Sequence, residues 1–306
     1  MGLKAFLEDS AAIEVGLWLG KNFRLKGLNH LAHFIGSVLA SRRNSSLVRY
    51  IEANQWVISG ENMSKSQLQE RTRETIRNDV LSLAEYFYYY QHPKEGFEKI
   101  ILSPRAEETL RDIIERKIPT ILLGPHLGNY DLFGMSLAWL GLRPYVLSYP
   151  NPNNAYKAQN RMREAVGMNV HPISFSSFRE ARKALKEGYC VVTGLDRPLP
   201  EGEDAKYRLR FFGRETALPV FYTRLALETN ATVRVACGIR REDGDYFVDA
   251  TDPILMEKRD DLVEESVLNA ERVLRPTEDF IRRAQSQWCM PHPVWPEVLP
   301  VVEKLT

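Results

Sequence analysis

The stretch Gly124–Asp131, which reads Gly-Pro-His-Leu-Gly-Asn-Tyr-Asp, places a histidine and a carboxylate five positions apart. The apolar run at 120–124 predicts a strand before it, and the apolar pattern after Asp131 predicts a helix. Such a corner puts the imidazole of His126 at the carboxyl end of a strand, where open α/β sheets usually hold their ligands. With Asp131 holding one ring nitrogen, His126 can act as a general base on a substrate hydroxyl.

Other residue patterns narrow this chemistry. No Gly-x-Ser-x-Gly elbow is present, and Cys190 lies inside a predicted strand, so no enzyme nucleophile accompanies His126. The nearby glycines match neither a dinucleotide fingerprint nor a phosphate-binding loop. Cys190, Cys237 and Cys289 form no Cys-x-x-Cys pair, which predicts neither a disulfide framework nor a metal site. We expect no metal and no cofactor. Many ordinary helix starts carry a histidine and an acid, so these residues alone leave a structural role open.

The composition is that of an ordinary globular protein, with 44% hydrophobic and 26% charged residues among 306 and a net charge of +1. This balance gives no support for a nucleic-acid partner. No run reaches the roughly 18 apolar residues that a membrane-spanning helix needs, and no signal-peptide pattern is found. The widely spaced cysteines fit a reducing, cytosolic compartment. We therefore expect a protein that is soluble or that lies on a membrane surface.

Residues 1–95 are predicted to form an N-terminal helical, membrane-associating region. Apolar side chains recur at helical spacing in residues 1–45, and residues 1–60 hold seven Lys or Arg against four acidic residues. Two readings stay open for this first segment. It packs on the protein's own core, or it lies in the interface of an anionic membrane with Trp18 and Phe23 as anchors.

A second long helix is predicted from the Ser-Lys-Ser-Gln run at 64–67, which is a capping-box pattern. This helix ends in an aromatic cluster at 86–90. Because aromatic side chains bury large areas, the cluster is typical of a core or a domain seam. We expect it to join the helical region to the rest of the chain.

The pattern changes at residue 96 to alternating strands and helices. Predicted strands cover 120–124, 145–148, 168–173 and 189–194, helices lie between them, and a hairpin is expected over 231–251. The alternation predicts an α/β core over residues 96–306, with a mainly parallel central sheet flanked by helices. Asp196 follows a strand, so a second acid is expected at a carboxyl strand end.

Four stretches, in this order, resemble motifs of the lysophospholipid and lipid A acyltransferase superfamily. Gly124–Asp131 resembles its His-x4-Asp motif, Arg163–Val170 its arginine-containing helix end, and Thr193–Arg197 its acid-arginine strand end. Phe211–Arg214 resembles the Phe-Phe-Gly signature of the lipid A (Kdo2-lipid IVA) acyltransferases. The Arg-Glu-Ala-Val-Gly run from Arg163 and the tail Trp288–Trp295 look more like the phosphatidylinositol mannoside acyltransferase branch.

The resemblance implies a glycerolipid acyltransferase-like fold and an O-acyltransferase activity. A long fatty acyl chain would move from a thioester, either acyl-CoA or acyl carrier protein as co-substrate, to a hydroxyl of a membrane glycolipid or lysophospholipid. His126 would take the hydroxyl proton, and Asp131 would orient the histidine and stabilise its positive charge. The protein would bind peripherally to the cytoplasmic face of the cell membrane, because the transmembrane anchor common in lipid A acyltransferases is absent.

The resemblance also implies roles for five further residues in substrate binding. Asn129, with backbone N–H groups at the helix start, would stabilise the oxyanion. Arg163 would meet a phosphate of donor or acceptor. Asp196 would accept hydrogen bonds from acceptor hydroxyls, with Arg197 positioning it. Arg214 completes the set.

Purely structural or surface roles are the alternatives for these residues. The arginines fit a solvated helix face or a surface ion pair, and Asp196 fits a turn cap. Two other functions also stay open. A thioesterase or lipid hydrolase would use the same dyad to activate water, and a membrane-binding protein without catalysis would need no base at all.

Overall fold

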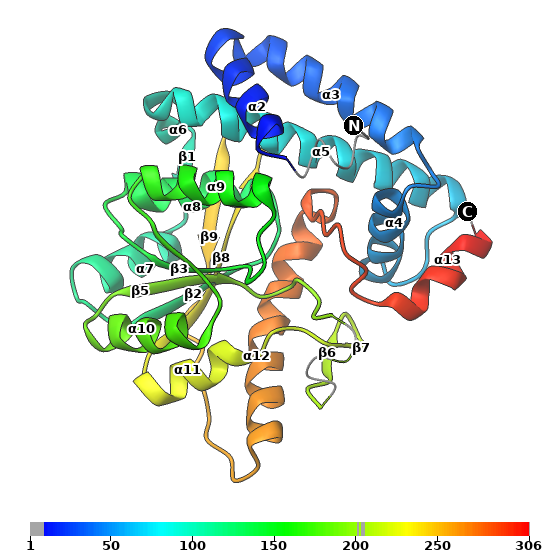
Figure 1. The fold of residues 1–306 in the computed structure, drawn as a ribbon. Coiled ribbons are helices and arrows are strands. Elements are labelled where there is room, and N and C mark those ends of the chain that lie inside the picture. The colour runs from blue at the N-terminus through cyan, green and yellow to red at the C-terminus, as the bar shows by residue number, and fades with distance from the viewer. Residues whose placement is uncertain (1–8, 201, 203–205, 306) are drawn as a thin grey trace.

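The computed structural model describes residues 9–200, 202 and 206–305. Within these residues a seven-stranded sheet has the order β1–β9–β8–β2–β5–β3–β4 (Figure 1). All neighbouring strands pair in parallel except β8 and β9, which form an antiparallel hairpin. The strands are β1 (Ile100–Leu102), β2 (Thr120–Gly124), β3 (Tyr145–Ser148), β4 (Asn169–Pro172), β5 (Cys190–Gly194), β8 (Thr232–Arg240) and β9 (Tyr246–Ala250). The predicted α/β class with a mainly parallel sheet is confirmed.

Helices cover both faces of this sheet and continue into an N-terminal helical layer (Figure 1). They are α2 (Ser10–Asn22), α3 (Leu25–Ser41), α4 (Ser46–Ile58), α5 (Lys65–Gln91), α6 (Pro93–Glu98), α7 (Pro104–Ile114), α8 (Tyr130–Trp139), α9 (Asn154–Ala165), α10 (Phe175–Lys186), α11 (Phe221–Thr229), α12 (Leu262–Arg283) and α13 (Leu299–Leu305). Short 3-10 turns lie at Gln285–Gln287 (η1) and Pro296–Val298 (η2), and a small separate hairpin joins β6 (Leu209–Phe211) to β7 (Arg214–Thr216).

Strand β2 is central to the core because both of its faces are buried. Ile121 and Leu123 pack in the cluster that includes α10, α11 and α12. Leu122 points the other way, into the cluster formed with Phe133 of α8 and with α7. Successive side chains of a strand point to opposite faces, so a continuous apolar run suits a strand covered on both sides.

The aromatic cluster at 86–90 forms the predicted seam. Four buried rings near the end of α5, Tyr86 to Tyr89, pack with Leu132 and Met135 of α8 and with residues of α2, α3 and α9. The capping box is also confirmed, since the Ser64 hydroxyl accepts the Gln67 N–H while the Gln67 side chain accepts the Ser64 N–H.

The N-terminal segment differs in detail from its prediction. Instead of continuous helix over 1–45, α2 and α3 are separated at Phe23 and Arg24, whose backbones are extended. The first eight residues of the predicted segment lie outside the described part of the chain. Helix α4 and strand β1 were not predicted. Strand β1 has only three residues, and α4 buries the polar side chains of Glu52, Asn54 and Gln55, which interrupt its apolar pattern. In the described residues, no helix combines the length and the apolar character needed to cross a membrane.

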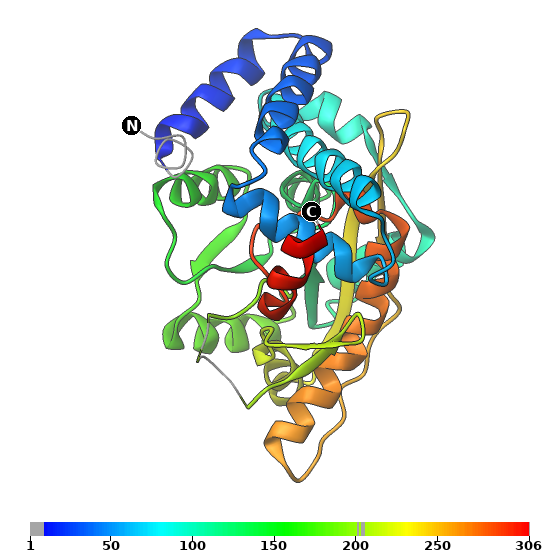
Figure 2. The ribbon, with the colours of Figure 1, turned by 90° about the vertical axis from the view of Figure 1, so that its right-hand side faces the viewer.

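The C-terminal segment returns to the N-terminal helices. Helix α13 lies beside α4 in Figure 2. The Asn54 side chain of α4 donates hydrogen bonds to the carbonyl oxygens of Met290 and His292. This return brings residues 285–295 next to the carboxyl end of β2 and the loop after it, which carries His126.

Candidate active site

Strand register brings His126 to Asp196. Strands β2 and β5 are parallel neighbours in which Gly124 is paired with Gly194, so the residues two positions further along each strand stand side by side. The carboxylate of Asp196 accepts the backbone N–H of His126 at 2.8 Å through Oδ2. Its other oxygen lies 2.6 Å from Nδ1 of the His126 ring. One buried carboxylate therefore fixes both the backbone and the ring of the histidine.

Asp196 is fully buried and ionised. Its Oδ2 also accepts a hydrogen bond of 2.8 Å from Nε1 of Trp288, which lies in the C-terminal segment. Burial opposes ionisation, but the neighbouring His126 ring and the hydrogen bonds from His126 and Trp288 outweigh it and hold the pKa of the Asp196 carboxyl below its usual value. In the neutral ring, an anionic partner at Nδ1 requires the hydrogen to be there, which leaves Nε2 with a free lone pair.

The exposed part of the His126 ring faces a cavity. About 24% of the side chain is accessible. The ring lies 5.0 Å from that of Tyr130, centre to centre, in an edge-to-face arrangement. Both residues line the cavity, which has a volume of about 450 Å³ and is within the usual range for small-molecule sites.

Asp131 does not hold the His126 ring as expected. It is buried in the first turn of α8, where its Oδ1 accepts hydrogen bonds from Arg163 of α9, at 3.1 Å from Nε and 2.5 Å from Nη2. Arg163 also donates to Asn160 at 2.8 Å and lies over the ring of Tyr156. The five-residue spacing carries Asp131 past the loop and around the helix, so its side chain meets α9. The expected His126–Asp131 contact is replaced by the His126–Asp196 contact.

Asn129 is the N-cap of α8 and does not line the cavity. Its Oδ1 accepts the Leu132 N–H, and its amide donates to the carbonyl oxygen of Ser82 and to the hydroxyl of Tyr246. These bonds occupy the buried amide. The side chain therefore holds the start of α8 against α5 and β9, in place of the expected contact with an oxyanion.

Gly128 lets the loop that follows β2 pack tightly against the rest of the fold. Its φ is +62°, and a Cβ at this position would lie 2.1 Å from the carbonyl oxygen of Gly238. Its N–H donates to the carbonyl oxygen of Gln287. The loop is thereby clamped between β8 and the C-terminal segment.

The remaining predicted site residues are divided between the cavity and the surface. Arg197 lines the cavity, with its guanidinium 3.8 Å from the centre of the Tyr149 ring, and Arg163 lines it together with Asp131. Arg214 lies elsewhere, on β7. It pairs with Glu61 and, at 3.6 Å, with Glu297, so it joins the small hairpin to the α4–α5 connection and the C-terminal turn. Its expected substrate contact is not supported by this position.

Three residues that the sequence did not single out for chemistry lie at the site. Trp288 fixes Asp196. Asp79 of α5 interacts electrostatically with His126. Its side chain remains accessible, yet the surrounding protein raises the pKa of its carboxyl to about 6, while a hydrogen bond from Cys289 acts in the opposite direction and lowers it. Burial, with Arg197 and His126 nearby, lowers the pKa of His292 to about 4, which keeps that ring neutral at pH 7. None of these three residues is close in sequence to the Gly124–Asp131 motif, so the motif could not predict their place at the site. The Trp-Pro-rich composition of the tail indicated only that an ordered segment lies there.

Six residues without polar side chains form one part of the cavity lining, and we call the space beside them the apolar arm. Its walls are Phe133, Gly134, Leu137, Val146, Met168 and Val192. The described residues contain no group of His, Cys, Asp or Glu side chains arranged to hold a metal ion. The site therefore combines an oriented imidazole with an apolar space.

Residues 15–297 match the model of a family described as bacterial lipid A biosynthesis acyltransferase. No curated protein matches the chain.

Proposed function

Because the chain belongs to the bacterial lipid A biosynthesis acyltransferase family and is an acyltransferase, we propose that it moves a long fatty acyl chain from a thioester to a hydroxyl of a membrane glycolipid or lysophospholipid. The donor is acyl-CoA or acyl carrier protein. The observation that carries the proposal is the His126–Asp196 pair beside a cavity with an apolar arm. This pair replaces the His126–Asp131 dyad that the sequence suggested.

In this mechanism Nε2 of His126 accepts the proton of the acceptor hydroxyl while the hydroxyl oxygen attacks the thioester carbonyl carbon. The resulting tetrahedral intermediate collapses, the carbon–sulfur bond breaks, and the thiolate takes the proton from the imidazolium. The products are an ester and a free thiol, and the histidine is neutral again. Asp196 holds the ring in the tautomer that this sequence needs and stabilises the transient positive charge.

The other polar side chains of the cavity have supporting roles. Asp131 and Arg163 neutralise each other and brace α8 against α9, which keeps the cavity walls in place. Arg197, stacked on Tyr149, presents a cation to an anionic group of donor or acceptor. A planar guanidinium is well suited to contact a phosphate through two parallel hydrogen bonds.

We also propose that α2 and α3 attach the protein peripherally to the cytoplasmic face of the membrane. Large apolar side chains are exposed along these helices: Val15, Trp18, Phe23, Phe34, Ile35 and Val38. Basic side chains are exposed beside them: Lys21, Arg24, Lys26, Arg42 and Arg43. Helix α2 contacts α9, which lines the cavity, so a membrane held by this surface would lie near the site. Apolar and basic side chains together favour an anionic lipid surface.

For the acceptor, the motif Arg163-Glu-Ala-Val-Gly and the Trp288–Trp295 tail favour a glycolipid like those of the phosphatidylinositol mannoside branch. The test incubates the full chain with palmitoyl-CoA or palmitoyl carrier protein and a glycolipid extract of host membranes, followed by mass spectrometry. We expect acylated glycolipid from the wild type, its loss in His126→Ala, and normal yield from His33→Ala, a matched change at an exposed position on α3. Free fatty acid without acylated lipid would instead make the protein a hydrolase, and full activity in His126→Ala would refute the mechanism.

The membrane proposal has its own test. Flotation with vesicles containing phosphatidylglycerol should recover the wild type but little of the Trp18→Ser/Phe34→Ser variant. Phe175→Ser is the matched control, because Phe175 on α10 is 97% exposed but lies outside this surface. Equal recovery of all three proteins would overturn the proposed attachment surface.

A further inference from the structure

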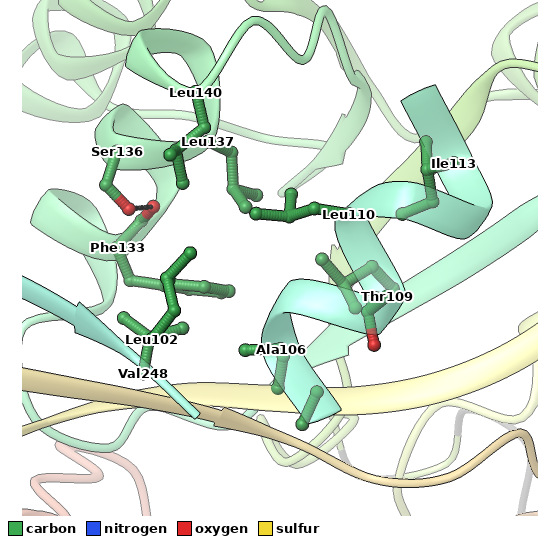
Figure 3. Close-up of a pocket in the computed structure, with 13 residues that line it drawn as sticks. Leu102, Ala106, Thr109, Leu110, Ile113, Phe133, Ser136, Leu137, Leu140 and Val248 are labelled. Atoms are coloured by element: carbon green, nitrogen blue, oxygen red, sulfur yellow. Dashed lines mark hydrogen bonds between the residues drawn. The ribbon is translucent and has the colours of Figure 1, made fainter. Parts of the chain in front are cut away.

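A second, much smaller cavity lies next to the large one and shares lining residues with it. It has a volume of about 20 Å³ and is lined mainly by apolar side chains, with Leu110 on α7 and Leu140 after α8 among them (Figure 3). Phe133 and Leu137 line both this void and the large cavity. These two buried side chains of α8 therefore form the wall between the two spaces.

The two spaces also share a floor. Val146 of β3, Val192 of β5 and Leu122 of β2 are register partners, so they form one row across three neighbouring strands. Val146 and Val192 lie under the apolar arm, and Leu122 lies under the void. An acyl chain that lies along this row from Val146 towards Leu122 would meet the wall and, without it, would continue into the void.

Helix α8 supplies the roof at regular intervals. Tyr130, Gly134 and Leu137 are spaced four and three residues apart, so they face the cavity on successive turns. Gly134 has no side chain to fill the arm, and a Cβ there would meet only the end of the Met168 side chain, at 3.4 Å. A glycine within a helix is unfavourable by itself, so its presence here is explained by the open space beneath it.

We propose that Phe133 and Leu137 set the longest acyl chain that the enzyme accepts, with the void behind them as the space into which a longer chain would extend. This inference rests on the proposed acyl transfer. The wall acts by exclusion. Each methylene that fits contributes about fourfold to affinity, and a methylene that meets a packed wall contributes nothing or forces a rearrangement.

The test measures binding of saturated acyl-CoA thioesters of even chain length, from lauroyl to arachidoyl, by calorimetry. The wild type should gain affinity with length up to a limit. Leu137→Ala should move that limit upward by about three carbons, which is the number that the substitution removes. Leu110→Ala is the matched control, because it enlarges the same void from its far side and leaves the wall intact.

Gly134→Leu should move the limit downward by filling the arm one turn before the wall. If Leu137→Ala does not fold, Gly134→Leu still tests the proposal, because this substitution adds volume instead of creating a cavity. An unchanged limit in both variants, or an equal shift in Leu110→Ala, would overturn the proposal.

Transfer to the glycolipid extract is measured on the same proteins to separate the two claims. If acyl-CoA binding shows the predicted limits but no acylated lipid forms, the proposed acyl transfer is contradicted and the proposed chain-length limit is supported. If acylated lipid forms but the chain-length limit is the same in all variants, only the role proposed for Phe133 and Leu137 is contradicted.

Discussion

The carboxylate of Asp196 holds both the ring Nδ1 and the backbone N–H of His126, at 2.6 and 2.8 Å, although the two residues are 70 positions apart in the chain. The contact follows from the pairing of Gly124 with Gly194 in adjacent parallel strands. Because the strands fix the spacing, this partnership does not depend on a flexible loop. The acid within the motif, Asp131, is thereby free to brace α8 against α9.

The Asp131–Arg163 pair should be a stability element. Both side chains are largely buried, at 8% and 12% exposed, and removing one partner of such a pair typically costs about 3–5 kcal/mol because the other charge is left unpaired. Arg163→Met should therefore lower the free energy of unfolding, measured by urea denaturation, by about that amount. The double variant Asp131→Asn/Arg163→Met should recover much of the loss. Additive losses in the double variant would mean that the two side chains are not coupled.

Gly128→Ala should damage the site more than an ordinary turn substitution. A Cβ would clash with the carbonyl oxygen of Gly238, and the positive φ adds strain. Gly141→Ala is the matched control, since Gly141 also has a positive φ but open space around it. We expect the control to cost about 1 kcal/mol in unfolding free energy with activity retained, and Gly128→Ala to cost more and to lose activity. Equal effects would show that the contact with Gly238 is unimportant.

Trp288→Phe should weaken the hold on Asp196 in a pH-dependent way. The pKa of Asp196 in the folded protein lies below its ordinary value of 3.8, so its contribution to stability is present above that pH and is lost as the pH falls through the folded value. Removing the Trp288 hydrogen bond raises the folded pKa and shrinks this contribution. The variant should therefore lose more unfolding free energy at pH 7 than at about pH 3, relative to the wild type.

Trp295→Phe controls for the packing lost in that substitution. Trp295 lies in the same aromatic cluster, is equally buried, and its Nε1 has no hydrogen-bond partner among the described residues. Its loss should be the same at both pH values. A pH-independent loss in Trp288→Phe as well would contradict the role given to its hydrogen bond.

Asp79→Asn should change the pH profile of kcat/KM. The surrounding protein raises the pKa of the Asp79 carboxyl from 3.8 to about 6, although the residue is exposed, so the carboxyl is neutral well below pH 6 and anionic above it. Its anion favours the imidazolium of His126, whereas Asp131 and the Cys289 thiol act on Asp79 itself in opposite directions. We expect a loss of about tenfold at pH 8 and no difference at pH 5. A loss of equal size at both pH values would point to a structural effect instead.

The sequence predicted those features that depend on local pattern. The apolar run before Gly124 predicted strand β2 with the boundaries found, and the Ser64 cap marked a true helix start. It also placed His126 and Asp196 at carboxyl strand ends. It did not join them, because the partnership depends on β5 lying beside β2 while β3, which comes first in the chain, lies beyond it.

The remaining site contacts are long-range and carry no periodic signal. Trp288 reaches Asp196 from 92 positions away, and its approach requires the C-terminal segment to pair at Leu127 with the loop that follows β2. The contact of Asp131 with Arg163 instead of His126 has a different cause. Residues close in sequence need not have side chains that meet, because residues in the first turn of a helix point in directions set by the helix and its cap.

In the proposed mechanism Asp196, and not Asp131, activates His126, and kcat for acyl transfer in Asp196→Asn and Asp131→Asn tests this directly. Both variants are first checked for folding by thermal denaturation. Folded Asp196→Asn should lose about 10²–10⁴ in kcat, since the histidine loses the anion that fixes its tautomer. Asp131→Asn should lose stability but stay within about tenfold of wild-type kcat when folded. Near-normal kcat in Asp196→Asn, with the large loss in Asp131→Asn, would contradict this mechanism.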